Sequence, residues 1–468
     1  MPMWSCDFQD CEKPCVRNAG ECILCDRHLC SIHLGVEYHQ CPRWEDEKAY
    51  DPAAGEAERK EINRLIDKIN ISALAARASQ LRNGISCSIP HLQYDAATRS
   101  SVMGGMNYHI SINFADGVTW LARIRKFNAT SPPPTLRDHI MESEVATLHF
   151  LERTGLPTPR VFYYAPECET NPVGVAYLLF EKMPGKSLRW SLANDVQRQR
   201  VIEQLADVFI RLHDFSFDLM GSLCLKNSPG KFCSSQGDVG AFARESLTDF
   251  RGSTMLTLGP YTSVREYHDA SLRLILDLIL REEIYAQRSL DAYLIHRFLL
   301  DLVPFLSNGP TTSQQNVFYL KHADDKGDHI LVDEAYNITG IVDWEWAYTA
   351  PAEIAFNSPI VFFDVAKFYD GSNHIDKDEV YFASQLELKG HDDLAKVVRN
   401  GRLQHRFAFC CGYNLDADWD GFLGLFLGLR NATGVDNDLD WFTWKSIALE
   451  RYKEDNDVKT LLNKSSQN

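Results

Sequence analysis

Alternating hydrophobic and polar residues predict a small region of strands in the first half of the chain. Residues 106–114 and 118–127 both follow a period of two, and the three residues between them are Ala-Asp-Gly. This pattern predicts a β-hairpin, because alternate side chains of a strand point to opposite faces. The same region is expected to contain a helix that ends near Arg153 and strands within residues 155–164 and 176–185.

Most of the rest of the chain shows helical periodicity. Residues 201–215 and 272–290 are the clearest helical stretches, and residues 329–344 contain two β-rich runs that predict a hairpin. Near the N-terminus, the polar stretch DPAAGEAE suggests a linker before apolar residues at helical spacing. These patterns divide the chain into a Cys-rich segment (1–48), a linker and helix (49–90), a small mixed lobe (91–185) and a large helical lobe (186–468).

Composition and charge restrict the classes of partner. The chain is 45% hydrophobic, as is usual for a globular protein, and its formal net charge is −16. Such an acidic chain would be repelled by nucleic acids and by anionic membrane surfaces. The sequence starts without the apolar segment of a secretory signal and has no apolar run near the roughly 18 residues of a membrane span. We therefore expect a cytoplasmic or nuclear protein that is not secreted and binds neither nucleic acid nor membrane.

The cysteines are concentrated at the N-terminus. Of 13 cysteines, seven lie in the first 41 residues, together with two histidines at short spacings from them. Pairs separated by two or four residues let one turn present two ligands to one metal ion. Eight of these residues would suffice for two tetrahedral zinc ions, while a cluster of buried thiols is the alternative. The eight candidates are Cys6, Cys11, Cys22, Cys25, Cys30, His33, His39 and Cys41.

This spacing resembles that of the AN-one class of zinc finger. The resemblance implies two structural zinc ions in interleaved sites and leaves Cys15 without a ligand role. Residues 1–48 contain nine acidic and five basic residues, which disfavours a DNA-binding face and favours a folding module or a contact with a protein partner. The implied groups are Cys6, Cys11, Cys30 and His33 for one ion and Cys22, Cys25, His39 and Cys41 for the other.

A second constellation fits phosphoryl transfer. This reaction needs a carboxylate near the acceptor hydroxyl, a metal ligand under the phosphates and a cation fixed by an acid. Here the sequence His322-Ala-Asp324 precedes the predicted hairpin, which leads to Asp343. The arrangement resembles the aminoglycoside phosphotransferase and choline kinase families over roughly residues 90–360. The resemblance implies a two-lobed, protein-kinase-like α+β fold, with Asp324 as the catalytic base or orienting group and Asp343 as the catalytic metal ligand.

The same resemblance implies a nucleotide site in the small lobe. Taken alone, however, Gly104 and Gly105 could form a simple turn, and Glu144 in the predicted helix could be an exposed residue. Arg125 lies on the same strand face as Arg123, so the phosphate-binding role could fall to either. The implied cofactor-binding residues are Gly104 and Gly105 in the nucleotide loop, Arg123 on the phosphates, Glu144 as its helix partner, and Glu181 in the hinge that faces the adenine.

One position departs from the family pattern. The asparagine expected five residues after Asp324, a second metal ligand, is replaced by His329. Magnesium prefers oxygen ligands, so Asp325 or Asp328 could substitute, or the ion could be manganese. The leading hypothesis is an ATP-dependent phosphotransferase, using Mg or Mn, that acts on a small-molecule hydroxyl of amino sugar or amino alcohol type. The alternative is a catalytically inactive kinase-like protein that serves as a zinc-finger interaction module.

Two acidic–aromatic stretches near the C-terminus bear on the acceptor. Solvated loop carboxylates are the favoured interpretation, and a cation-attracting acceptor pocket is the alternative. The residues are Asp416, Asp418, Trp419 and Asp420 in the first stretch and Asp436, Asp438, Asp440 and Trp441 in the second.

Overall fold

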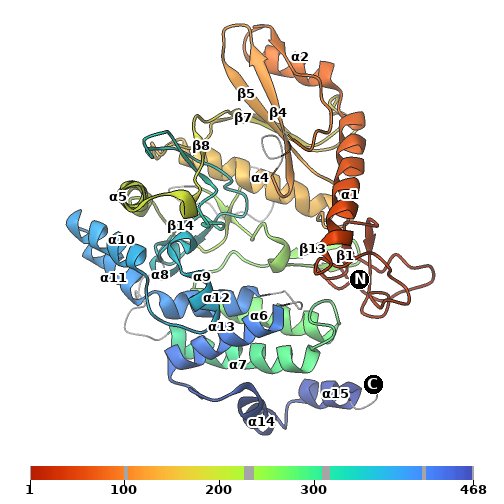
Figure 1. The fold of residues 1–468 in the computed structure, drawn as a ribbon, viewed down its shortest axis with the longest axis vertical. Coiled ribbons are helices and arrows are strands. Elements are labelled where there is room, and N and C mark those ends of the chain that lie inside the picture. Colours follow the sequence, from red (N-terminus) through yellow and green to blue (C-terminus); the bar gives the residue numbers. More distant parts are fainter. Residues whose placement is uncertain are drawn as a thin grey trace.

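The computed structural model describes residues 2–97, 99, 104–225, 237–307, 317–413 and 418–465. It has the expected α+β, two-lobed architecture (Figure 1). The small lobe is built on a five-stranded sheet, the large lobe is mainly helical, and an irregular N-terminal module lies beside both lobes. Among the described residues, no helix is long and apolar enough to cross a membrane.

The N-terminal module leads directly into a long helix. Its short strands β1 (Glu21–Cys22) and β2 (Arg27–His28) pair antiparallel, and helix α1 (Glu47–Lys68) follows. The linker predicted at DPAAGEAE is therefore wrong, because this stretch lies inside α1. Asp46 caps the helix by accepting a hydrogen bond from the backbone of Ala49 at 3.3 Å, and the Ala- and Glu-rich sequence has high helix propensity.

The small lobe is an antiparallel sheet covered on both faces. Strand order is β3–β4–β5–β7–β6. Trp120, Ala122 and Ile124 of β5 pack in one hydrophobic cluster with α1 and α2, while Leu178 of β7 packs with α4 in another. The predicted hairpin is confirmed as β4 paired with β5. The elements are α2 (Ile71–Leu81), β3 (Cys87–Ser88), β4 (Asn107–Phe114), β5 (Thr119–Arg125), α4 (Pro134–Leu151), β6 (Val161–Ala165) and β7 (Tyr177–Glu181).

The large lobe combines small sheets near the small lobe with a helical part farther away (Figure 1). Its elements are β8 (Lys186–Ser187), α5 (Asp195–His213), β9 (Ser216–Phe217), β10 (Ser222–Leu223), β11 (Val239–Gly240), β12 (Thr248–Arg251), β13 (Thr254–Thr257), α6 (Val264–Leu280), α7 (Ser289–Ser307), β14 (Phe318–Lys321), β15 (Ile330–Val332), β16 (Ile338–Ile341), β17 (Tyr348–Ala350), α8 (Ala352–Ala355), α9 (Val365–Tyr369), α10 (Lys377–Leu388), α11 (Asp392–Asn400), α12 (Arg402–Gly412), α13 (Trp419–Thr433), α14 (Trp441–Arg451) and α15 (Asn456–Ser465). Short 3-10 helices span Trp190–Leu192, Glu245–Leu247 and Ile360–Phe362.

Two sheets of the large lobe bring the segments that carry Asp324 and Asp343 close together, since His322 contacts the Val342 carbonyl at 3.0 Å. One sheet has the strand order β17–β14–β9, and its central strand β14 ends just before His322. The other has the order β16–β15–β8, and its strand β16 ends two residues before Asp343. The hairpin predicted within residues 329–344 is confirmed, since β15 pairs antiparallel with β16.

One predicted helix is shorter than expected. The pattern over residues 272–290 predicts a single helix, but α6 ends at Leu280 and a turn precedes α7. Glu282 and Tyr285 in this turn have positive φ angles of 63° and 51°. The turn binds the N-terminal module, since the Glu283 carbonyl accepts a hydrogen bond from the backbone of Arg17 at 2.7 Å. A contact between segments far apart in the sequence therefore overrides local helical periodicity.

Candidate functional site

The eight predicted ligands of the N-terminal module lie in two groups of four. Within each group the ligand atoms all lie within 4.8 Å of one another. The shortest approaches include 3.2 Å between Cys6 Sγ and His33 Nδ1 and 3.7 Å between Cys25 Sγ and His39 Nε2. Tetrahedral zinc, with bonds of about 2.0–2.3 Å, separates its ligands by roughly 3.3–3.8 Å, so this donor set fits the ion. The groups are Cys6, Cys11, Cys30 and His33, and Cys22, Cys25, His39 and Cys41, the membership that the resemblance implies.

Cys15 belongs to neither group. Its side chain is buried, and its thiol donates to the carbonyl of Val16 at 3.5 Å. Burial raises the pKa of the Cys15 thiol far above its ordinary value. A neutral, buried thiol of this kind contributes to the core of the module rather than to metal binding.

A cleft lined by residues of the small lobe and by Glu345 of the large lobe contains a buried cation held by an acid. Arg123 Nη1 donates to Glu144 Oε1 at 2.7 Å, and Nη2 contacts the other carboxylate oxygen. The side chain of Glu144 is buried in α4, so it is not the exposed helix residue of the alternative interpretation. Arg123 Nη1 also lies 3.9 Å from Asp343 Oδ1. Glu144 therefore fixes the Arg123 guanidinium beside the predicted metal ligand.

Arg125 faces the same cleft but has different partners. It forms an ion pair with buried Glu345, and its Nη2 lies 3.3 Å from Glu245 Oε1 and 3.3 Å from Met106 Sδ. Glu345 also accepts a bond from Asn107 Nδ2 at 3.4 Å. Arg125 thus joins the strand of the small lobe to the large lobe, and Arg123 is the arginine beside Asp343.

Sequence reasoning missed both acids that bind Arg125. The available signal was the position of Glu345, only two residues after the predicted metal ligand Asp343. Burial opposes ionisation of Glu345, but Arg125 and Arg123 outweigh it and lower its pKa. Glu245 comes from a distant segment, and its sequence carried no comparable signal.

Asp343 occupies a strained backbone position close to Arg123. Its φ angle is 60°, a left-handed conformation that non-glycine residues adopt rarely. Half of its side chain is exposed (50%). Partial removal from water nevertheless raises the pKa of Asp343, and the positive charge of Arg123 only partly opposes this rise. The next residue, Trp344, is buried and donates from Nε1 to the carbonyl of Ile341 at 3.0 Å, which helps to hold the bend.

Asp324 is held close to this bend by its own motif. Its backbone N–H donates to His322 Nδ1 at 3.2 Å, so His322 Nε2 carries the proton that it donates to the Val342 carbonyl at 3.0 Å. The Asp324 carboxylate accepts a bond from Lys326 Nζ at 2.7 Å. Lys326 was not singled out from the sequence, although it lies only two residues after Asp324.

The residue that replaces the family asparagine is a buried, neutral imidazole. His329 stacks on His322 with ring centroids 4.1 Å apart, and its Nδ1 has no hydrogen-bond partner among the described residues. Burial lowers the pKa of His329 well below its ordinary value. Asp325 is occupied, since it pairs with Lys321 at 2.6 Å, and exposed Asp328 lies 3.7 Å from Lys326.

These cleft residues do not form a compact ligand group by themselves. Within the described parts of the chain, only the two Cys/His groups of the N-terminal module bring three or more potential ligand atoms within 4.8 Å of one another. Asp324, Asp343 and His329 are therefore farther apart than a closed, all-protein metal site requires. An open site that shares its ion with phosphate oxygens has no such requirement.

The remaining predicted nucleotide residues lie at the surface of the small lobe. Gly104 and Gly105 are exposed, and the backbone of Gly104 donates to the carbonyl of Asn107 at 2.9 Å. A Cβ atom at either glycine would meet nothing within 4 Å. Glu181 ends β7 with an exposed side chain, and its backbone N–H donates to the Arg160 carbonyl at 2.9 Å.

Two of the C-terminal carboxylates cap helices, and a third forms an ion pair. Asp418 accepts from the backbone of Gly421 at 3.0 Å, and Asp440 accepts from that of Phe442 at 2.9 Å. Asp436 pairs with Arg451 at 2.7 Å. These three residues are therefore not free loop carboxylates, and Asp416 lies outside the described residues.

The family comparison identifies the class of protein. The model of the phosphotransferase enzyme family matches residues 115–354, slightly more than half of the chain. The chain therefore belongs to this family. The match includes β5, α4 and the segments that carry Asp324 and Asp343, which are the elements that form the cleft.

Curated relatives match shorter stretches. A subtelomeric hrmA-associated cluster protein of Aspergillus fumigatus is 37% identical over 124 residues, which are 26% of this chain and 23% of the relative. Altered inheritance of mitochondria protein 9 of Candida glabrata is 28% identical over 141 residues, which are 26% of this chain and 21% of the relative. The chain thus matches less than a quarter of the length of these relatives.

Solved structures with a similar fold are more distant in sequence. The GDP complex of aminoglycoside 2'-phosphotransferase-IIIa is 15% identical with a TM-score of 0.38, and the match covers 83% of this chain and 99% of that chain. The ternary complex of streptomycin, ATP and APH(2")-IIa is 11% identical with a TM-score of 0.42, covering 77% and 97%. Similarity at this level says nothing about the substrate of this chain.

Proposed function

We propose that this chain is an ATP-dependent phosphotransferase that acts on the hydroxyl group of a small amino sugar or amino alcohol. The observation that supports this most directly is the buried Arg123–Glu144 pair with Arg123 Nη1 3.9 Å from Asp343. Phosphate binding requires such a cation, fixed by an acid and placed beside a metal-binding carboxylate. Membership of the phosphotransferase enzyme family supports the same class of reaction.

In this proposal each cleft residue has a separate role. Arg123 neutralises phosphate charge, and Asp324 accepts the proton of the acceptor hydroxyl as its oxygen bonds to the γ-phosphorus and the bond to the ADP oxygen breaks. Lys326 stays protonated, because its bond to Asp324 and the nearby carboxylates outweigh burial and raise its pKa. It keeps Asp324 oriented until the substrate arrives.

A divalent ion would be held from one side of the cleft. Asp343 supplies a partly exposed carboxylate, and His329 supplies a neutral nitrogen without a hydrogen-bond partner among the described residues. One oxygen and one imidazole suit Mn²⁺ better than Mg²⁺, which prefers oxygen ligands. When bound, the ion would neutralise charge on the transferred phosphate.

For the N-terminal module we propose two structural zinc ions. Each group of four offers thiolate and imidazole donors at spacings that suit tetrahedral zinc. The module has little regular structure among its described residues, so bound metal would supply much of its stability.

The test of the function is ATP consumption by the purified full chain with Mg²⁺ or Mn²⁺ across amino alcohols and amino sugars. We expect ATP consumption with one acceptor. Asp324→Asn should lower the turnover rate at least about 100-fold while ATP binding persists. Equal turnover by Asp324→Asn would exclude Asp324 as the base.

A catalytically inactive, kinase-like interaction protein is the second candidate. The observation that favours it is His329 at the position of a metal-binding asparagine, stacked on His322. Thermal unfolding with and without ATP and a divalent ion separates the two candidates. No stabilisation by nucleotide, together with no turnover on any acceptor, would favour the inactive protein.

A further inference from the structure

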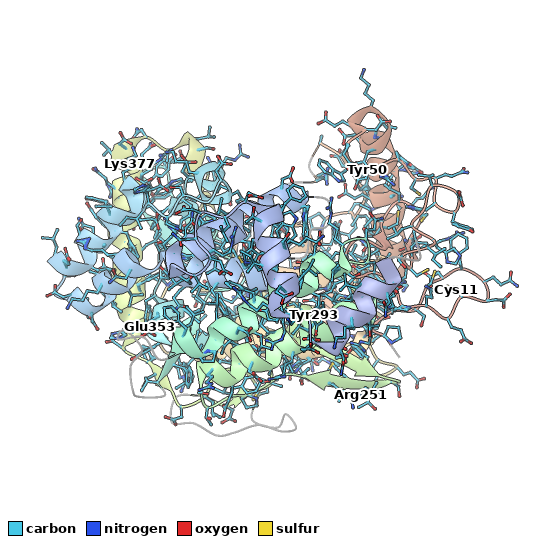
Figure 2. All side chains as sticks on the ribbon, turned by 90° about the horizontal axis from the view of Figure 1, so that it is seen from below. Cys11, Tyr50, Arg251, Tyr293, Glu353 and Lys377 are labelled. Atoms are coloured by element: carbon cyan, nitrogen blue, oxygen red, sulfur yellow. The ribbon has the colours of Figure 1, made fainter. Side chains whose placement is uncertain are left out.

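The N-terminal module contacts the large lobe through a buried ion pair. The side chain of Arg17 is only 9% exposed and lies 3.0 Å from the carboxylate of Glu283, which is 1% exposed. Arg17 Nη1 also donates to the carbonyl of Thr248 at 3.0 Å. Glu283 follows α6 and Thr248 begins β12, so the module is anchored to two separate parts of the large lobe. Figure 2 shows Cys11 of the module and Arg251 of β12 on the same side of the molecule.

A second contact involves the first residues of the chain. Met3 is buried in a small hydrophobic cluster, and Trp4 packs against it. The cluster joins the module to α4 of the small lobe, to β12 and β13 of the large lobe, and to the segment after Asp343. Its other members are Leu136, Ile140, Ala243, Phe250, Met255 and Trp346.

This cluster touches both sides of the cleft. Leu136 and Ile140 lie eight and four residues before Glu144 in α4, so all three follow one stripe of the helix. Trp346 lies three residues after Asp343 and has a positive φ angle of 64°. The contacts of Met3 and Trp4 therefore lead to the acid that holds Arg123 and to the strained segment that carries the metal-binding carboxylate.

The module fixes the position of these two residues. The Trp4 carbonyl accepts a hydrogen bond from the backbone of Cys15 at 2.9 Å, and the Trp4 ring stacks on His28 at 4.5 Å. The backbone of Cys6, two residues later, donates to the Lys13 carbonyl at 3.0 Å. Cys6 is itself in the first ligand group, so metal binding and the placement of Met3 and Trp4 involve the same short segment.

We propose that the surface bound by the N-terminal module is this chain's own two-lobed body, and that Met3 and Trp4 are positioning residues for Glu144 and Asp343. The consequence for the cleft rests on the proposed function. The module acts as a brace: with its metal bound, it holds α4 and the segment after Asp343 in the arrangement that lets Arg123 face Asp343.

The test uses the full zinc-loaded chain and compares Trp4→Ala and Met3→Ala with Trp44→Ala. Trp44 belongs to the same N-terminal region but is 61% exposed and lies outside the cluster, so it is the matched control. Hydrogen–deuterium exchange is measured in peptides covering residues 134–151 and 341–347, zinc content is measured in parallel, and ATP affinity is measured by titration.

The expected result is exchange about tenfold faster in both peptides for Trp4→Ala and Met3→Ala, with zinc retained and Trp44→Ala unchanged. Removal of zinc from the wild-type chain should raise exchange in the same peptides. ATP affinity should fall with the faster exchange. Unchanged exchange in both peptides for Trp4→Ala and Met3→Ala, with zinc retained, would overturn the brace. If the wild-type chain does not bind ATP, the proposed function fails, and the exchange data still decide whether the module positions α4.

Discussion

Replacing the buried Arg17 by alanine should weaken the attachment of the N-terminal module to the large lobe more than replacing an exposed residue of the same interface. Arg17 loses a buried ion pair with Glu283 and a hydrogen bond to the Thr248 carbonyl. Lys13 offers the matched control: it contacts Glu282 at 3.7 Å across the same interface, but 47% of its side chain is exposed.

The two costs can be compared from the contacts. Removing one member of a buried ion pair costs about 3–5 kcal/mol, because the remaining charge is left without compensation. Here Arg281 Nε remains 3.4 Å from Glu283 and offsets part of that cost. We expect Arg17→Ala to lower the free energy of unfolding by about 2–4 kcal/mol. For Lys13→Ala we expect at most about 0.5 kcal/mol, because water screens an exposed pair.

The assay is equilibrium urea unfolding of the zinc-loaded chain, followed by circular dichroism and tryptophan fluorescence. Combining Arg17→Ala with Glu283→Gln should cost less than the sum of the single changes, with a coupling energy of about 1–3 kcal/mol. Equal effects of Arg17→Ala and Lys13→Ala, or additive effects of Arg17→Ala and Glu283→Gln, would show that the buried pair does not hold the module.

Three further predictions concern the cleft and the metal groups. Because burial raises the pKa of Asp343, its ionised form destabilises the folded protein at neutral pH. Asp343→Asn should therefore raise the melting temperature at pH 7, and this gain should shrink as the pH falls toward 3.8, the ordinary pKa of the group. An equal gain at both pH values would contradict the reasoning. His329→Asn restores an oxygen ligand and should raise Mg²⁺-supported over Mn²⁺-supported turnover by about tenfold; an unchanged ratio would remove His329 from the metal site. Elemental analysis should find one zinc ion fewer in Cys22→Ser than in the wild type but no loss in Cys15→Ser, and equal zinc content in both variants would contradict the ligand groups.

The parts of the fold that follow from local pattern could be predicted from the sequence. The period-two alternation in β5 places Arg123 and Arg125 on one face, opposite Trp120, and the structure has this arrangement. Cysteine spacing alone suggested eight ligands, and their division into two groups depended on the resemblance to a known finger. The chemical roles of Asp324, Asp343 and His329 stay predictions.

The features that the sequence could not supply depend on contacts between distant segments. Nothing near Arg125 indicates that Glu245 approaches it within 3.3 Å, since 120 residues separate them. The turn after α6 was predicted as helix because only the local pattern was visible. The ion pair of Glu283 in this turn with Arg17 joins residues 266 positions apart. Only the first part of α1 was misread, for a local reason: Pro52 and Gly55 resemble linker residues, although the N-cap at Asp46 favours a helix. The apolar residues after them did predict the second part.

The helices that cover the small-lobe sheet also determine how the chain can be divided. Ile62 and Leu65 of α1 and Leu74 of α2 cover the apolar face that β4 and β5 share, although the family match begins only at residue 115. A fragment cut to that match would lose β3 and half of the β4–β5 hairpin, and one cut before β4 would expose Ile110, Ile112 and Trp120 to water. Such a surface promotes aggregation. The segment recognised by similarity is therefore smaller than the unit that can fold alone, and residues 47–81 belong to the phosphotransferase domain in a physical sense.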